Sequence, residues 1–85
     1  MRLIELDPQW EHENHLVFNC PTCPRDPEKG RYGNCLIQIP VKPRENGWDS
    51  NGETAFEKLS IMPSIWHHCE SDPHFFITEG EIKMA

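Results

Sequence analysis

Four cysteines and a late histidine are the residues of this chain whose types and spacing best suit metal binding. Cys20 and Cys23 form a C-x2-C pair, in which one turn can aim both sulfur atoms at a single ion. Cys69 and His74 follow much later, at the start of a dense apolar segment. Three cysteines and one histidine are a common tetrahedral set for structural zinc. The sequence therefore predicts that Cys20, Cys23, Cys69 and His74 bind one structural Zn²⁺.

The fourth ligand of this site has competing candidates. Cys35 would complete a shell of four thiolates. His74 would then not bind the metal but form a hydrogen bond to one of its ligands. His67 and His68 precede Cys69 directly and are two further candidates. Two disulfides are the other use of four cysteines, although a close C-x2-C pair bridges itself poorly as a structural staple. Spacing alone leaves the choice of fourth ligand open.

Catalytic motifs match this chain less well. His12 and His15 are three residues apart, whereas the helical zinc-protease motif H-E-x-x-H needs a spacing of four. The zinc deaminase pattern also fails, because Asn14 and Asn19 stand where that motif has glutamate and proline. A G-x-S-x-G segment and a phosphate-binding loop are both absent from the sequence. These comparisons favour a structural metal site over a catalytic one.

Length, charge and hydrophobic content limit the classes of function. The chain has 85 residues, of which 36% are hydrophobic, so we expect one domain over residues 1–85 with a small core. Its formal net charge is −6, whereas a nucleic-acid binder needs a basic face. No stretch reaches the ~20 apolar residues of a membrane span, and no apolar leader opens the chain. We therefore expect a cytoplasmic protein that binds neither membrane nor nucleic acid, a setting that favours metal thiolates over disulfides.

Short strands and turns dominate the pattern along the chain. Strands are predicted over residues 1–6, 16–20, 36–41 and 58–61. Pro40 confines its strand to a sheet edge, residues 10–15 are expected to form a polar connector, and residues 24–33 an exposed loop. The clearest hairpin covers residues 74–84, where Gly80 can adopt the positive φ that its turn requires. The predicted class is mostly β, a zinc-ribbon-like antiparallel domain, with a small α+β fold as the alternative.

The three tryptophans are candidates for a contact surface, because tryptophan is enriched where proteins bind one another. Trp48 lies between two Asn-Gly pairs, which are turn signals, so among the three it is the candidate for an exposed side chain. Residues 63–68 are the second candidate segment. We expect at least two of the three tryptophans simply to supply core area.

Several short motifs occur in a recognisable order between residues 16 and 84. They are Cys20-Pro21-Thr22-Cys23, Gly47-Trp48, Pro63-Ser64-Ile65 and a terminal segment with Cys69, His74-Phe75-Phe76-Ile77 and Gly80-Glu81-Ile82. In this order the chain resembles a family of small bacterial and phage-encoded zinc-binding proteins of unknown function, found near ubiquitin-like conjugation genes. The resemblance implies that Cys20, Cys23, Cys69 and His74 are the zinc ligands. The chain has a longer gap before His74 than the family pattern, and Cys35 stands where some relatives have histidine.

These observations together favour a binding protein over an enzyme. We expect a zinc-stabilised protein-interaction module, encoded by a phage or prophage, that acts on a protein of the bacterial host or of a conjugation system. The first alternative is a metal-dependent hydrolase or transferase accessory that uses Cys69, His67 or His68. The second is a zinc ribbon that binds nucleic acid.

Overall fold

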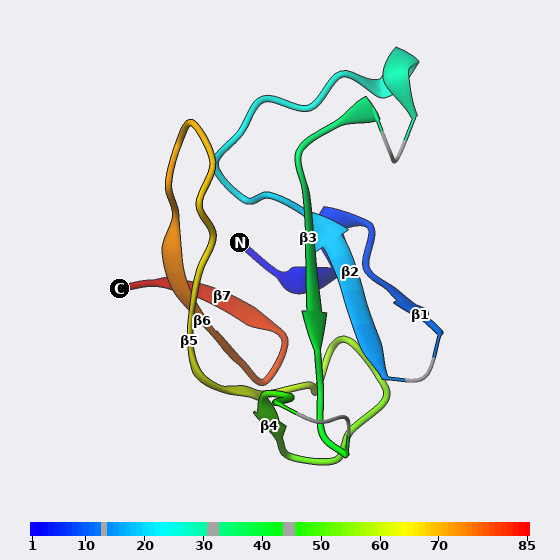
Figure 1. Cartoon of the computed structure of the whole chain (residues 1–85), viewed down its shortest axis with the longest axis vertical. Helices are drawn as coiled ribbons and strands as arrows, with labels where there is room; N and C mark the ends of the chain where they lie inside the picture. Colours follow the sequence, from blue (N-terminus) through cyan, green and yellow to red (C-terminus); the bar gives the residue numbers. More distant parts are fainter. Residues whose placement is uncertain (13, 31–32, 44–45) are drawn as a thin grey trace.

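Short β-strands and single-turn 3-10 helices make up the regular structure of the protein (Figure 1). The computed structural model describes residues 1–12, 14–30, 33–43 and 46–85. In chain order, the elements of these residues are η1 (Leu3–Leu6), β1 (Gln9–Glu11), β2 (His15–Asn19), η2 (Pro27–Lys29), β3 (Leu36–Pro40), β4 (Asp49–Ser50), β5 (Ile61–Trp66), β6 (His74–Thr78) and β7 (Glu81–Met84). The mostly β class predicted from the sequence is confirmed, since no α-helix occurs in these described ranges. None of their helices has the length and apolar character needed to cross a membrane.

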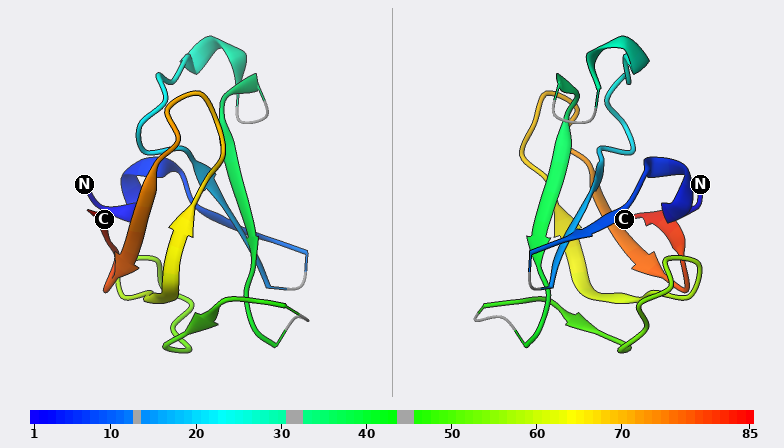
Figure 2. Two further views of the ribbon diagram at one scale, coloured as in Figure 1. Left: turned by 60° about the vertical axis from the view of Figure 1, so that its left-hand side comes forward. Right: turned by 90° about the vertical axis from the view of Figure 1, so that its right-hand side faces the viewer.

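The strands form two antiparallel sheets, which Figure 2 shows from two further directions. One sheet has the order β1-β2-β3, and β3 lies at its edge, as Pro40 predicts. The other sheet has the order β4-β5-β6-β7. Its last two strands form the predicted hairpin, in which Thr78 pairs with Glu81 and Gly80 has a φ of 78°. The strands expected over 16–20 and 36–41 correspond to β2 and β3.

Three expectations about local structure were wrong. Residues 1–6 contain the 3-10 helix η1 instead of a strand. Its buried residues Leu3 and Leu6 are three apart, which is the repeat that places side chains on one face of a 3-10 helix. Residues 10–15 contain most of β1, and the strand expected over 58–61 begins only at Ile61 and continues to Trp66. It can pass through Pro63 because β4 pairs only with Ile61 and Met62, so the missing N–H of the proline is not needed there.

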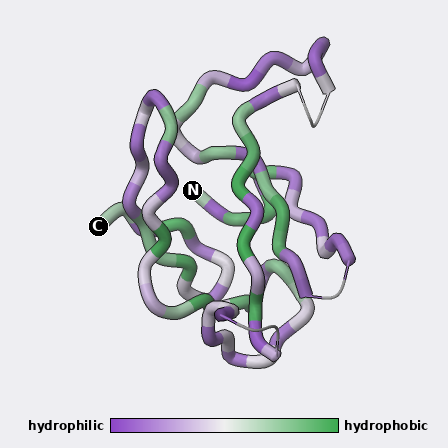
Figure 3. Tube along the Cα trace, viewed as in Figure 1, coloured by the Kyte–Doolittle hydropathy of each residue, from purple (hydrophilic) through white to green (hydrophobic). Residues whose placement is uncertain are grey.

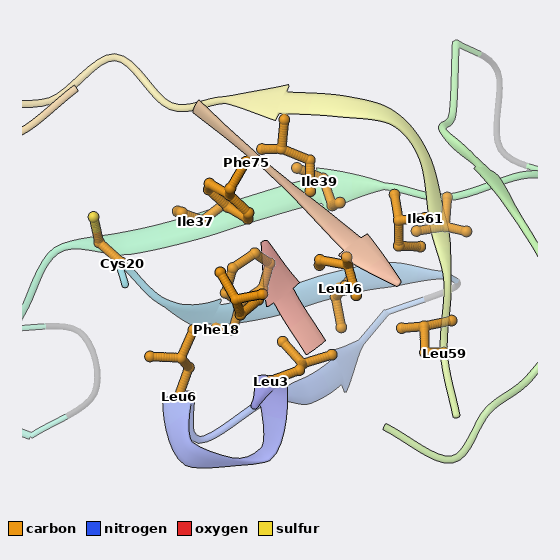
Figure 4. Close-up of a cluster of buried hydrophobic side chains, with 14 residues drawn as sticks. Leu3, Leu6, Leu16, Phe18, Cys20, Ile37, Ile39, Leu59, Ile61 and Phe75 are labelled. Atoms are coloured by element: carbon orange, nitrogen blue, oxygen red, sulfur yellow. The ribbon is translucent and has the colours of Figure 1, made fainter. Parts of the chain in front are cut away.

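The hydrophobic core lies between the two sheets (Figure 4). Phe18 of β2 and Phe75 of β6 meet edge to face, with ring centroids 6.1 Å apart and an interplanar angle of 83°. Other side chains at most 1% exposed come from η1, from both sheets and from the segment before β5: Leu3, Leu16, Leu59, Ile61 and Ile77. Figure 3 shows that the loop containing η2 is mostly hydrophilic. Residues 24–30 and 33 agree with the exposed loop predicted there, whereas positions 31 and 32 lie outside the described residues.

Substitution of Gly80 should destabilise the protein for two separate reasons. A Cβ atom at this position would lie 2.5 Å from the Glu57 carbonyl oxygen, and the φ of +78° is left-handed. The left-handed conformation alone costs an L-residue about 1–2 kcal/mol. We expect Gly80→Ala to lower the free energy of unfolding, measured in urea, by more than that amount.

The matched control for this prediction is Gly52→Ala. Gly52 has a similar φ of +82°, but a Cβ atom there would have no neighbour within 4 Å. Its substitution should therefore show only the conformational cost. Equal losses of stability in the two variants would contradict the close approach of the Glu57 backbone to Gly80.

Candidate functional site

All four cysteines gather at one end of the two sheets. Their Sγ atoms, from Cys20, Cys23, Cys35 and Cys69, lie within 4.8 Å of one another. The Sγ of Cys69 is 3.9 Å from that of Cys20 and 3.6 Å from that of Cys23. Four sulfur atoms bound to one Zn²⁺ at about 2.3 Å would be about 3.8 Å apart in a tetrahedron. The cysteines are free thiols, so this cluster could hold one metal ion such as zinc.

Strand register explains how Cys35 joins the cluster. Asn19 pairs with Leu36 at the end of the β2–β3 ladder, and the Cys20 N–H donates to the Cys35 carbonyl oxygen at 3.0 Å. The loop between these strands is closed by Asn34, whose side-chain amide donates to the carbonyl oxygens of Asp26 and Gly30. Cys69 arrives from the other sheet, on the loop between β5 and β6. Figure 1 shows the tip of that hairpin beside the segment that follows β2.

Hydroxyl groups surround the sulfur atoms. Ser71 Oγ lies 3.1 Å from the Sγ of Cys23 and 3.4 Å from that of Cys69. This hydroxyl is the main reason that the pKa of the Cys69 thiol falls to about 6, and the Asp72 N–H lowers it further against the opposing effect of burial. Burial, by contrast, raises the pKa of the Cys35 thiol well above its ordinary value. A bound cation would reverse that preference, because a thiol that coordinates a metal is deprotonated.

His74 lies outside this cluster. Its strand β6 alternates between exposed and buried residues, so His74 and Phe76 share the outer face while Phe75 enters the core. The Nε2 atom of His74 is instead 2.8 Å from Ser64 Oγ. The structure thus brings together Cys20, Cys23 and Cys69 of the expected ligand set, adds Cys35, and leaves the histidine on the other side of the sheet.

An irregularity in β5 occurs in the segment that contains Ser64. Ile61 pairs with Ile77 and Ile65 pairs with Phe75, so four residue steps on β5 (65 − 61) match two on β6 (77 − 75). Such bulges re-aim side chains and are common next to active sites. Ser64 and Trp66 flank the buried Ile65 on β5, and both point to the outer face that carries His74.

Aromatic rings enclose the His74 imidazole on the outer face of the sheet. The Trp66 ring stacks on it, with centroids 5.8 Å apart and an interplanar angle of 26°. The Phe76 ring also lies beside it, at 6.5 Å and the same angle. Trp66 is 56% exposed and Phe76 43% exposed. The serine and histidine therefore form a solvent-accessible pair with an aromatic surround.

The remaining candidate residues lie near one site or the other. His67 Nε2 is 3.4 Å from Cys35 Sγ, and burial lowers the pKa of this histidine. His68 is exposed and tilted against Trp66, with centroids 4.9 Å apart. The expectation of an exposed Trp48 was wrong: this side chain is half-buried against the core, and its indole N–H points to the Ser64 carbonyl oxygen at 3.4 Å.

Ser64 was missed as a functional residue in the sequence, although Pro63-Ser64-Ile65 is one of the motifs of the family resemblance. The absence of G-x-S-x-G carries little weight here, because that motif belongs to the strand–turn–helix of one α/β fold. The sequence favoured His74 as a metal ligand because it follows Cys69 closely enough for both to reach one ion, and an imidazole suits a zinc ion as well as a serine hydroxyl. Only the fold distinguishes these two uses.

The fold and these two sites define a small β protein with a four-cysteine cluster and an exposed serine–histidine pair. Residues 4–85 match the model of the BubE family, which is described as the serine protease of a bacterial ubiquitination-like system. The chain therefore belongs to the BubE family. This membership agrees with the resemblance to proteins found near ubiquitin-like conjugation genes. No curated protein and no solved structure gives a significant match.

The choice between Cys35 and His74 as fourth ligand can be tested by zinc affinity. Cys35→Ser should weaken zinc binding by more than the roughly 10–100-fold that the loss of an outer hydrogen-bond partner costs. Ser71→Ala removes such an outer partner and should stay within that range. His74→Ala should leave the affinity unchanged. Competition with a chromogenic chelator measures all three, and a larger loss in His74→Ala than in Cys35→Ser would contradict the four-cysteine site.

Proposed function

We propose that this chain is a serine protease in which Ser64 is the nucleophile and His74 the general base. The observation that carries the proposal is the 2.8 Å separation between Ser64 Oγ and His74 Nε2. The heavy atom of a general base must lie within about 2.6–3.2 Å of the oxygen whose proton it removes. The description of the BubE family as a serine protease supports the same assignment.

The proposed reaction proceeds through an acyl-enzyme. With the imidazole protonated on Nδ1, the Ser64 hydroxyl donates its hydrogen bond to Nε2. The Oγ atom bonds to the carbonyl carbon of the scissile bond while its proton passes to His74. That proton then moves to the leaving amine as the C–N bond breaks. Water then attacks the carbonyl carbon of the resulting ester and gives one proton to His74. His74 passes this proton to Ser64 Oγ as the ester C–O bond breaks, which releases a carboxylic acid and restores the Ser64 hydroxyl.

The proposed substrate is a protein of the bacterial ubiquitination-like system named in the family description. His74 is exposed and Ser64 is partly exposed on the outer face of the four-stranded sheet, so a polypeptide can reach them without opening the core. This substrate would be the protein partner that the sequence led us to expect.

We assign the metal a structural role and zinc as its identity. Cys20, Cys23, Cys35 and Cys69 would fill a tetrahedral shell and leave no position for the water that a catalytic zinc requires. Zinc binding at such sites supplies about 10–16 kcal/mol of apparent free energy. That energy is large beside the ~5–15 kcal/mol net stability of an ordinary domain. The metal would therefore hold the fold in place, and Ser64 and His74 would perform the chemistry.

The second candidate function is the protein-interaction module expected from the sequence. The exposed side chains of Trp66 and Phe76 favour it, because aromatic residues dominate the energetics of protein contacts. The two candidates differ in their need for a nucleophile. A pure binding module would work equally well with alanine at position 64.

Labelling by a fluorophosphonate, which reacts with an activated serine hydroxyl, tests the protease proposal. The wild-type protein should be modified on Ser64, as mass spectrometry of its peptides can locate. Ser64→Ala should abolish labelling, and His74→Ala should slow it by about 10²–10⁴-fold, the usual contribution of a general base.

The matched control is Ser50→Ala on the neighbouring strand, whose hydroxyl accepts a hydrogen bond from the Gly52 N–H. This variant should label at the wild-type rate. Folded, zinc-loaded wild-type protein that is not labelled at all, or labelling that persists in Ser64→Ala, would show that Ser64 is not an activated nucleophile.

A further inference from the structure

We propose that Trp66 is a positioning residue for His74, an inference that rests on the proposed function of the serine–histidine pair. Trp66 is 56% exposed, yet both ends of its indole have partners. Its ring stacks on the His74 imidazole at 5.8 Å and 26°. Its Nε1–H donates to Asp72 Oδ1 at 2.9 Å. These two contacts fix the orientation of the exposed Trp66 side chain, and its ring can in turn restrict the orientation of the His74 imidazole.

His74 requires such support, because a single hydrogen bond does not fix the orientation of its ring. Within the part of the chain that the structure describes, its ring makes one hydrogen bond, to Ser64. In a Ser-His-Asp triad a carboxylate on the other ring nitrogen orients the imidazole and stabilises the imidazolium that forms on proton transfer. No described carboxylate occupies that place here. Orientation and charge stabilisation must come from another group.

An aromatic ring face can supply both effects. Stacking restricts the tilt of the imidazole, and the negative face of an aromatic ring attracts a cation within about 6 Å of its centroid. Trp66 lies inside this distance at 5.8 Å, whereas Phe76 lies outside it at 6.5 Å. Trp66 is also the ring with a hydrogen-bonding anchor. The main positioning role therefore falls to Trp66.

Asp72 acts on His74 through the indole. It belongs to the loop between β5 and β6, has a left-handed φ of 49°, and donates its N–H to the Cys69 carbonyl oxygen at 3.1 Å. Its carboxylate is also 3.6 Å from His68 Nδ1. Asp72 thus contacts Trp66, Trp66 contacts His74, and His74 contacts Ser64. This series of contacts resembles a catalytic triad with an aromatic ring between the carboxylate and the imidazole. Asp72 lies in the same loop as Cys69.

Two measurements on Trp66→Ala test this role. The rate constant of fluorophosphonate labelling should fall by roughly 10–100-fold, the size expected when a catalytic group is slightly misplaced. The ring protons of His74, which the stacked indole shifts upfield in the NMR spectrum, should move toward the positions of an exposed histidine. Trp66→Phe retains a stacking ring but loses the hydrogen bond to Asp72, so it should recover only part of the labelling rate. Met84→Ala removes a side chain of similar exposure, 54%, from the same sheet and should change neither measurement.

The outcomes separate this inference from the protease proposal. Unchanged His74 signals in Trp66→Ala would overturn the positioning role, whatever the labelling rate. A slower rate with unchanged signals would also overturn it, because Trp66 would then act only on the probe. If the wild-type protein is not labelled but its His74 signals depend on Trp66, the positioning role holds and the protease proposal fails.

Discussion

The structure depends on the convergence of four sulfur atoms from three separate segments. Cys20 and Cys23 follow β2, Cys35 precedes β3, and Cys69 lies between β5 and β6. The first three adjoin the strands of one sheet and the last adjoins those of the other, so a metal ion there would join the two sheets at one end while Phe18 and Phe75 join them in the middle. A chain with a core this small gains much from such a link, because small domains bury too little surface to be very stable.

The β5–β6 hairpin connects this constraint to the proposed chemistry. Its two strands carry Ser64, Trp66 and His74 on the face directed away from the core, and its loop carries Cys69. Asp72 ties the loop to Trp66 through the indole hydrogen bond. A metal ion that fixes the loop at the cysteine cluster would therefore also restrain the residues around the imidazole. This arrangement gives a small sheet with few supporting elements a means to hold a serine and a histidine in hydrogen-bonding geometry.

Much of the fold was predictable, because β2, β3 and the β6–β7 hairpin have clear patterns and turn residues. The site was predictable only in part. Spacing identified Cys20, Cys23 and Cys69 as members of the cysteine cluster. Cys35 joins them through the β2–β3 register, which cannot be predicted from local sequence. Ser64 and His74 meet through the pairing of β5 with β6, which depends on the whole sheet. A histidine ten residues after a serine carries no such information by itself.

X-ray absorption at the zinc edge of the purified protein tests the central claim most directly. The account predicts about one zinc ion per chain, surrounded by four sulfur atoms at about 2.3 Å with no nitrogen in the shell. This result would place all four cysteines on the metal and leave His74 available to Ser64. A shell of three sulfur atoms and one nitrogen, or a folded protein that contains no metal, would contradict it.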